Sequence, residues 1–292
     1  MEVAVSEVTK RAAGLAALAL DRVLPSRNSE RVGVLMYHRT APTTSVDAND
    51  QLNVPPGQFR AHLLGLQELG YNFIGIDQLI NWLNGTTELP DNSVHVTFDD
   101  GYACTAQFAA PILQELDIPA TVFVNTAFTG DSDAFPFDPN RSRYGDAGVD
   151  PVNYRPMSSN ELHGLIADST ITIGAHSHSH SNFVEHPEDF DEDIMLNTKI
   201  LREDYGLESI PFAFPYGVVR LGYAGGELSR RISVLNVTCA FSTEPELIDR
   251  SDDRYCLGRF SAYPFDTPRT LAAKLNGWLG WISGARQLLN RG

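Results

Sequence analysis

Cysteine is scarce in this chain, which has three among 292 residues, at positions 104, 239 and 256. An odd number at such wide spacing forms neither a disulfide framework nor a CxxC pair, so a reducing compartment is the simpler expectation. Positive charge is also in short supply, since 22 Lys and Arg stand against 37 Asp and Glu, for a formal net charge of −15. This deficit, together with the absence of a basic stripe, argues against a nucleic-acid partner.

Long hydrophobic runs are missing as well, and no stretch is long enough to span a bilayer. Residues 10–20, KRAAGLAALAL, have the basic pair and the apolar run of a signal peptide. However, the run is short, and Asp21 and Arg22 follow it without a cleavage site. An amphipathic helix that packs on the domain or lies on a membrane surface fits better. We therefore expect a cytoplasmic protein, with peripheral membrane contact through its terminal helices left open.

Nucleotide-binding signatures are absent too, because the chain has no GxGxxG and no P-loop. What it does have is a regular alternation of short apolar runs and helical patterns. Strands are expected at 32–38, 72–76, 94–98, 120–125, 170–175, 212–214, 239–241 and 256–260. Helices are expected at 55–70, 76–85, 103–117, 158–169, 187–206 and 225–236. Such alternation predicts parallel strands covered by helices, in a barrel or a doubly wound sheet.

Three further features modify this pattern. Pro111 lies inside the helix expected at 103–117 and predicts a kink or a restart there. Residues 128–156 form a long loop rich in Asp, Pro, Gly and aromatic residues, which is either a wall of the substrate site or a solvated insertion. Residues 270–292 predict an amphipathic helix, for which docking on the barrel is favoured over contact with a membrane or a partner protein.

The stretch VHVTFDDGY, residues 94–102, places two carboxylates side by side where a buried strand ends. Like charges this close are unfavourable unless a positive charge lies near them. A second stretch, IGAHSHSHSNF at 173–183, follows another strand with His176, His178 and His180. The histidines with spacing four can converge on one ion, and two imidazoles plus one carboxylate are a common ligand set for zinc or a similar divalent metal. The position of these groups at the ends of different strands favours a TIM-like barrel.

Three motifs occur in the order TFDDGY (97–102), IGAHSHSH (173–180) and FAFPYG (212–217). They resemble the motifs of the polysaccharide deacetylase family, which is the NodB-homology domain of carbohydrate esterase family 4. The resemblance covers roughly residues 32–260. It implies an α/β fold, a distorted TIM-like (β/α)7 barrel, and metal-dependent removal of an acyl group, usually acetyl, from an amino sugar. The expected parts are an N-terminal amphipathic extension at 1–30, the deacetylase domain at 31–265 and a C-terminal amphipathic helix at 266–292.

Carried onto this sequence, the resemblance implies Asp100, His176 and His180 as metal ligands. Zn²⁺ is the expected ion, and Co²⁺, Ni²⁺ or Fe²⁺ are alternatives because they bind similar ligand sets. The resemblance also implies that Asp99 is the base that takes a proton from the attacking water, and that the backbone N–H of Tyr216 is an oxyanion donor. Substrate contacts are expected from Pro215, Tyr216 and Tyr37.

The sequence departs from the family pattern in three places, one of which is His178, at a position that the family leaves variable and from which it could compete as a metal ligand. Ala213 stands where many members carry an arginine that orients the base, and Arg259 in a late strand is a candidate to supply that charge from across the barrel. Members usually protonate the leaving amine with a late histidine, but no histidine follows His186. His38, at the end of the first strand, is the best substitute for this general acid, and His178 is another candidate.

The function expected from these features is a metal-dependent hydrolase that removes an acyl group, usually N-acetyl, from an amino sugar in a polysaccharide, oligosaccharide or glycolipid intermediate. Two alternatives stay open: a catalytically silent barrel that binds carbohydrate, and a deformylase that acts on a lipid-linked amino sugar. Asp99 argues for catalysis, because a protein that only binds sugar needs no base. The sugar, the acyl group, the physiological metal and the oligomeric state are not determined by the sequence.

Overall fold

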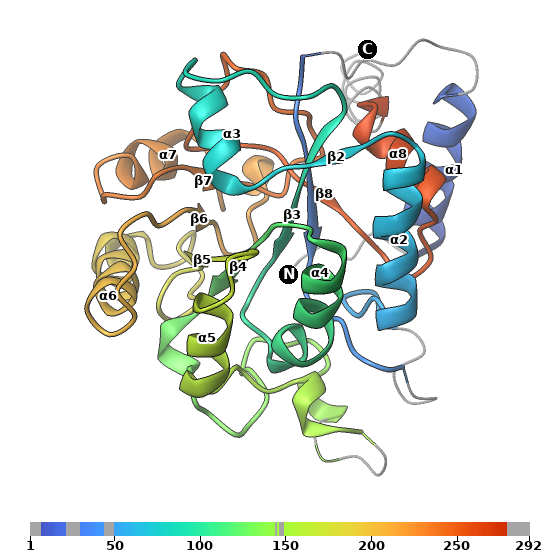
Figure 1. Ribbon diagram of the computed structural model, residues 1–292. Coiled ribbons are helices and arrows are strands. Elements are labelled where there is room, and N and C mark those ends of the chain that lie inside the picture. The colour runs from blue at the N-terminus through green and yellow to red at the C-terminus, as the bar shows by residue number, and fades with distance from the viewer. Residues whose placement is uncertain (1–6, 22–29, 44–49, 144, 146–148, 279–292) are drawn as a thin grey trace, which may run out of the picture.

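The computed structural model describes residues 7–21, 30–43, 50–143, 145 and 149–278, and its centre is a sheet of parallel strands (Figure 1). The strands are β1 (Gly33–Tyr37), β2 (Asn72–Phe73), β3 (Ser93–Phe98), β4 (Ala120–Val124), β5 (Ile171–Ala175), β6 (Phe212–Ala213), β7 (Ala240–Phe241) and β8 (Phe260–Ser261). All eight expected strands are therefore present. Their order in the sheet is β7-β6-β5-β4-β3-β1-β8, while β2 pairs with the start of β3.

One short stretch of chain joins the two ends of this sheet. Leu257 forms a parallel bridge with Phe241 in β7, and three residues later Phe260 pairs with Leu35 in β1. Residues 257–260 therefore pair with β7 at one end of the strand order and with β1 near the other end, so the sheet curls round on itself. This confirms the distorted TIM-like barrel expected from the sequence.

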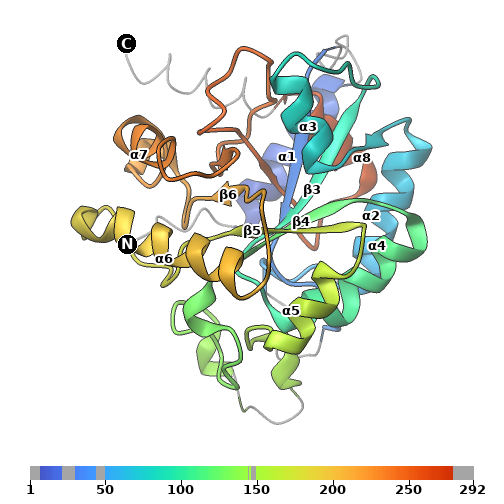
Figure 2. The same ribbon diagram turned by 60° about the vertical axis from the view of Figure 1, so that its left-hand side comes forward.

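Helices surround the strands in both views (Figures 1 and 2). They are α2 (Pro56–Glu68), α3 (Ile76–Leu83), α4 (Ala110–Leu116), α5 (Ser159–Ile166), α6 (Phe190–Glu203) and α7 (Gly226–Ile232). The helix expected at 103–117 is interrupted as Pro111 predicted. A π-helical turn at Thr105–Ala109 precedes α4, and Pro111 lies in the first turn of α4, where a missing N–H breaks no helical hydrogen bond.

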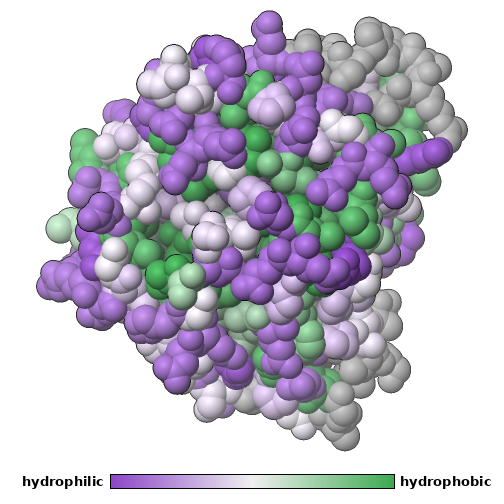
Figure 3. Space-filling view, in the orientation of Figure 1, coloured by the Kyte–Doolittle hydropathy of each residue, from purple (hydrophilic) through white to green (hydrophobic). Residues whose placement is uncertain are grey.

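The strands are mostly apolar because both faces of the sheet are covered, although β3 also buries the polar side chains of His95 and Thr97. Every residue of β1, β3 and β4 is buried. Hydrophilic side chains dominate the outer surface seen in Figure 3, with smaller apolar areas between them. His62 is fully buried, because α2 turns it towards the core, where the Tyr37 hydroxyl and the carbonyl oxygen of Asp266 contact its ring nitrogens.

The two terminal helices lie side by side against the barrel (Figure 1). Helix α1 (Glu7–Asp21) packs on α8 (Pro268–Leu275), where Ala17, Ala273 and Trp278 form a small buried cluster. Lys10 lies over the ring of Tyr263 at 4.5 Å, which adds a cation–π contact to this packing. Docking of both segments on the barrel is thus confirmed for the described residues. Trp281 and the rest of the tail helix expected up to residue 292 lie outside them.

None of the described helices has the length and apolar character needed to cross a membrane. The outer face of α1 exposes Val8 and Leu15, which lie two helical turns apart. Peripheral membrane contact through this helix stays a prediction, as does the compartment expected from the sequence.

Candidate active site

The carboxyl ends of the barrel strands meet around a cavity of about 320 Å³. Parallel strands in a barrel all direct their carboxyl ends to the same face, so side chains that directly follow different strands become neighbours. Asp99 and Asp100 follow β3, His176 follows β5, and His38 follows β1. The predicted site residues that line the cavity are His38, Asp99, Asp100, His176, His180 and Tyr216.

Asp100, His176 and His180 form a buried cluster of possible metal ligands. The Nε2 atoms of His176 and His180 lie 3.3 Å and 3.5 Å from Oδ1 of Asp100, and one ligand atom from each residue lies within 4.8 Å of the others. The Nδ1 of His176 donates to the carbonyl oxygen of Ala213 at 2.8 Å, which leaves Nε2 to face the cluster. Convergence of two imidazoles and a carboxylate on one point is a donor set that fits a divalent cation.

His178 does not join this cluster. Its Nδ1 lies 2.9 Å from the hydroxyl of Thr126, on the other side of the turn. Its side chain does not line the cavity in the described part of the chain. The histidines with spacing four are therefore the pair that converges, as the sequence predicted.

The local backbone at this site is unusual. Asp100, Ser177, His180 and Tyr216 have φ angles between +54° and +72°, which non-glycine residues seldom adopt. Such conformations have a free-energy cost and cluster at functional sites, where the surrounding fold holds them. Gly101 also has a positive φ, +80°, and a Cβ there would come within 2.9 Å of Val124, so this position of the DDG motif requires glycine.

Arg259 forms a buried bidentate ion pair with Asp99. Nη1 donates to Oδ1 at 2.6 Å and Nη2 to Oδ2 at 2.8 Å, and the side chain of Arg259 is fully buried. Its Nε donates to the carbonyl oxygen of Ser242 and its Nη1 also contacts the hydroxyl of Thr97, so the guanidinium is fixed at several points. Arg259 therefore makes the contact with Asp99 from across the barrel that was expected of it in the absence of an arginine at position 213.

These charges set the protonation of the carboxylates and imidazoles. Burial alone would raise the pKa of Asp99, but the charges of Arg259 and His176 hold it below the usual range. Burial is likewise outweighed at Asp100, whose pKa is held well below the usual range by a hydrogen bond from His176 and by the charge of His38. Burial lowers the pKa of His180 to about 4. Both carboxylates are therefore ionised at neutral pH and His180 is neutral. At His176 burial is outweighed by the charge of Asp99 and by the hydrogen bond to Asp100, which raise its pKa.

Two of the predicted substrate contacts are not supported. Tyr37 is buried between β1 and α2, where its hydroxyl lies 3.2 Å from Nδ1 of His62 and its ring packs on Phe59. Side chains alternate between the two faces of a strand, so Met36 and His38 line the cavity while Tyr37 points the other way.

Pro215 is also buried and does not line the cavity in the described part of the chain. Its carbonyl oxygen accepts from the N–H of Gly217, so its role is to shape the turn. Tyr216, by contrast, is 39% exposed at the cavity, and its ring lies edge-on to His180 at 4.8 Å.

Several lining residues were missed by the sequence analysis. Phe137 belongs to the long loop at 128–156 and stacks on the ring of His180, with centroids 3.8 Å apart. The next residue, Asp138, is buried in an ion pair with Arg39 and accepts a hydrogen bond from Tyr102 at 2.7 Å. This supports the interpretation of the loop as a wall of the site rather than a solvated insertion.

Lys10 is a second lining residue that no signal in the sequence indicated. It comes from the N-terminal helix α1, and its Nζ donates to Oε1 of Gln51 at 2.8 Å. Only the docking of α1 on α8 brings it to the cavity.

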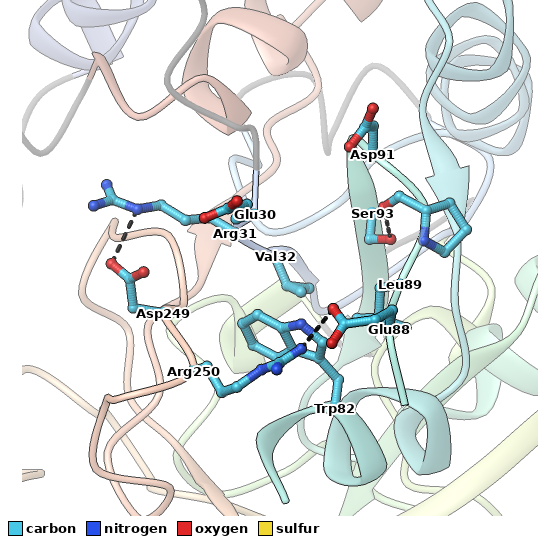
Figure 4. Close-up of a pocket in the computed structure, with 11 residues that line it drawn as sticks. Glu30, Arg31, Val32, Trp82, Glu88, Leu89, Asp91, Ser93, Asp249 and Arg250 are labelled. Atoms are coloured by element: carbon cyan, nitrogen blue, oxygen red, sulfur yellow. Dashed lines mark hydrogen bonds and ion pairs between the residues drawn. The ribbon is translucent and has the colours of Figure 1, made fainter. Parts of the chain in front are cut away.

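A larger cavity, of about 500 Å³, lies at the opposite end of the barrel (Figure 4). It is bounded by Val32, which precedes β1, and by Ser93, the first residue of β3. Four of its charged side chains form two ion pairs, in which Arg31 contacts Asp249 and Arg250 contacts Glu88. None of the predicted site residues lies here, and the amino ends of barrel strands usually serve stability rather than chemistry.

Comparison with known proteins finds similarity to one family. A family model for polysaccharide deacetylase matches residues 86–222. This segment of the chain is therefore similar to a polysaccharide deacetylase domain. The matched segment includes Asp99, the three possible metal ligands and Tyr216, whereas His38 and Arg259 lie outside it.

Individual relatives agree with this assignment. The putative polysaccharide deacetylase YxkH of Bacillus subtilis (strain 168) is 31% identical over 94 residues, an alignment that spans about a third (32%) of each chain. Among solved structures, the deacetylase PplD of Streptococcus pyogenes superposes with a TM-score of 0.68 at 19% identity, covering 84% of this chain and 98% of PplD. IcaB from Ammonifex degensii gives a TM-score of 0.67 at 22% identity, covering 85% and 98%. These structures share the fold of this chain.

Proposed function

We propose that this protein is a metal-dependent hydrolase that removes an N-acetyl group from an amino sugar in a polysaccharide, oligosaccharide or glycolipid intermediate. The observation that carries the proposal is the position of Asp99, an ionised carboxylate, beside the cluster of Asp100, His176 and His180 in one cavity. A site that only bound sugar would not need this carboxylate. The structure of PplD contains acetate, the product expected here, which supports acetyl as the group removed.

Asp100, His176 and His180 would hold the metal, for which Zn²⁺ is the first choice and Co²⁺, Ni²⁺ or Fe²⁺ are alternatives. A divalent metal supplies Lewis-acid chemistry, which lowers the pKa of water and stabilises negative charge on a carbonyl oxygen. Two adjacent carboxylates are tolerated because each has its own positive partner. Arg259 neutralises Asp99, and the cation would neutralise Asp100.

The side chains of the site have separate tasks in this proposal. Asp99 accepts the proton of the attacking water, and Arg259 keeps it ionised and fixes the direction of its oxygens. His38, half-buried at the end of β1, donates a proton to the leaving amine. The backbone N–H of Tyr216 stabilises the negative oxygen of the tetrahedral intermediate.

The direct test is acetate release from N-acetylated chitin oligomers, peptidoglycan fragments, nucleotide sugars and lipid-linked sugars, with protein of known metal content. The variant Asp99→Asn should lower kcat by about 10²- to 10⁴-fold, the usual contribution of a general base, without loss of bound metal. Asp131→Asn, on an exposed part of the long loop, is the matched control and should keep full activity.

The same assay separates the alternatives. Formate release from a formylated lipid-linked amino sugar, without acetate release, would favour the deformylase. Metal-loaded protein that binds one of the sugars but releases neither acid would favour the silent barrel. In that case the affinity for sugar would be the same in Asp99→Asn as in the natural protein.

A further inference from the structure

The turn that carries the two histidines is held from outside the site by helix α6. Asp193, in the first turn of α6, points its carboxylate at residues 178 and 179. Oδ1 accepts from the backbone N–H of His178 at 2.5 Å, and Oδ2 accepts from the N–H of Ser179 at 3.1 Å and from its hydroxyl. One side chain thus binds three donors in the middle of the sequence His176–His180.

This turn needs external support because its backbone is strained. Ser177 and His180 have φ angles of +67° and +54°, in the left-handed region that L-residues seldom occupy. Left-handed residues persist only when the surrounding structure enforces them. The N–H groups of residues 178 and 179 would also lack acceptors within the turn, and a carboxylate is the strongest acceptor that a side chain offers.

A second contact from the same face of α6 supports the turn from behind. Asn197 lies four residues after Asp193, so both side chains project from one side of the helix. Its Nδ2 donates to the hydroxyl of Thr126 at 2.9 Å, and that hydroxyl in turn contacts the ring of His178. Helix α6 therefore contacts the backbone of the turn directly and the side chain of His178 through Thr126.

We propose that Asp193 is a positioning residue of the metal site, whose carboxylate holds the turn that directs His176 and His180 to one ion. The inference rests on the metal site of the proposed function. Groups that hold metal ligands in place from outside typically contribute 10- to 100-fold to metal affinity. Asp193 neither lines the cavity nor contacts the ligand atoms, so it acts through residues 178 and 179 of the turn.

The experiment compares Asp193→Asn with Glu192→Gln. Glu192 is exposed in the same turn of α6, so the control removes an equal charge at nearly the same place without touching the turn. The dissociation constants for Zn²⁺ and Co²⁺ are measured on the metal-free full chain by competition with a chromophoric chelator. Unfolding temperatures are measured in parallel in the presence of excess chelator.

We expect the metal affinity to fall at least about tenfold in Asp193→Asn and to change less than about twofold in Glu192→Gln. The unfolding temperature of metal-free Asp193→Asn should stay close to that of the natural protein, which separates positioning from general stability. If Asp193→Asn does not fold, Ser179→Ala removes a single donor to the same carboxylate and should weaken metal binding about two- to tenfold.

Three results would overturn the inference: unchanged metal affinity in the Asp193 or Ser179 variant, an equal loss in Glu192→Gln, or no metal binding by the natural protein. Metal binding is measured here without substrate. A protein that binds metal as expected but releases no acetate would therefore contradict the proposed reaction and leave the role of Asp193 standing.

Discussion

Arg259 is the side chain on which the chemistry of Asp99 depends most directly. A buried carboxylate is strongly disfavoured unless a cation with good geometry faces it, and the planar guanidinium meets both oxygens of Asp99 at once. Lysine carries the same charge but cannot form this bidentate contact. The pair therefore offers a test that separates geometry from charge.

In Arg259→Lys, kcat/KM should fall at least about tenfold, the equivalent of one charge-assisted hydrogen bond. Arginine lowers the pKa of Asp99 against the effect of burial, so a weaker partner lets that pKa rise. The acid limb of the pH profile of kcat/KM should then move to higher pH, because Asp99 must be ionised to act. Arg250→Lys, at the opposite end of the barrel, should change neither value. An unchanged acid limb in Arg259→Lys would remove Arg259 from the mechanism.

His38 is tested by the choice of leaving group. In His38→Gln, deacetylation of an N-acetyl sugar should slow about 100-fold, because an amine leaves only when protonated. An acetyl ester with a phenolic leaving group needs no such proton, so its hydrolysis should change much less. Both rates are measured on metal-loaded protein, with His186→Gln as an exposed control. An equal loss on both substrates would show that His38 does not act as the general acid.

Helix α5 shows how an element beyond the catalytic groups helps to hold the site wall. Near the end of the long loop at 128–156 lies Arg155, whose guanidinium binds both oxygens of Glu161 at 2.8 Å and 2.7 Å. Glu161 also accepts from the N–H of Ser158, the N-cap of α5, and so completes a capping box. The hydrogen bonds from Arg155 lower the pKa of Glu161 to about 2.

This depressed pKa predicts a pH-dependent contribution to stability. The stabilisation is fully present above the ordinary carboxyl pKa of about 4.5 and is lost as pH falls towards about 2. Glu161→Gln should lower the free energy of unfolding at pH 7 by about 1 kcal/mol, because both the cap and the ion pair are weakened. Urea unfolding between pH 5 and pH 3 should show a shallower fall for the variant than for the natural protein. Equal slopes would contradict the prediction, and the exposed Glu188→Gln serves as control.

The molecule as a whole includes its N-terminal helix. Helix α1 covers Ala273 and Trp278 of the C-terminal segment and also carries Lys10 to the wall of the cavity. One helix therefore contributes both to the packing of the barrel and to the shape of the site. This predicts that α1 is part of the folded unit and not a detachable extension.

Deletion of residues 1–21 should lower the free energy of unfolding by at least about 2 kcal/mol, the value for exposing one large apolar side chain. The fluorescence of Trp278, which is 2% exposed, should shift to longer wavelength, and KM should rise because a cavity wall is lost. The double variant Val8→Ser/Leu15→Ser changes only the exposed face of α1 and should leave stability unaltered. A deletion with full stability and unchanged KM would show that α1 is dispensable.

The sequence by itself determined the strands and the core of the site. Parallel strands covered on both faces are rich in apolar residues, so runs such as 94–98 and 120–125 stand out without any structural information. The ligands are equally local, because Asp99 and Asp100 adjoin each other and His176 and His180 are four residues apart. Spacing along the chain carries this information directly.

Only the tertiary structure decided which distant residues meet. Arg259 reaches Asp99 across a separation of 160 residues, and sequence reasoning could name it as a candidate but not place it. Tyr37 was misassigned because one step along a strand reverses the face of the sheet, and the sequence does not show which face holds the cavity. Lys10 and Phe137 reach the site through the docking of a helix and the anchoring of a loop. Such contacts depend on the packing of whole segments, for which no local pattern exists.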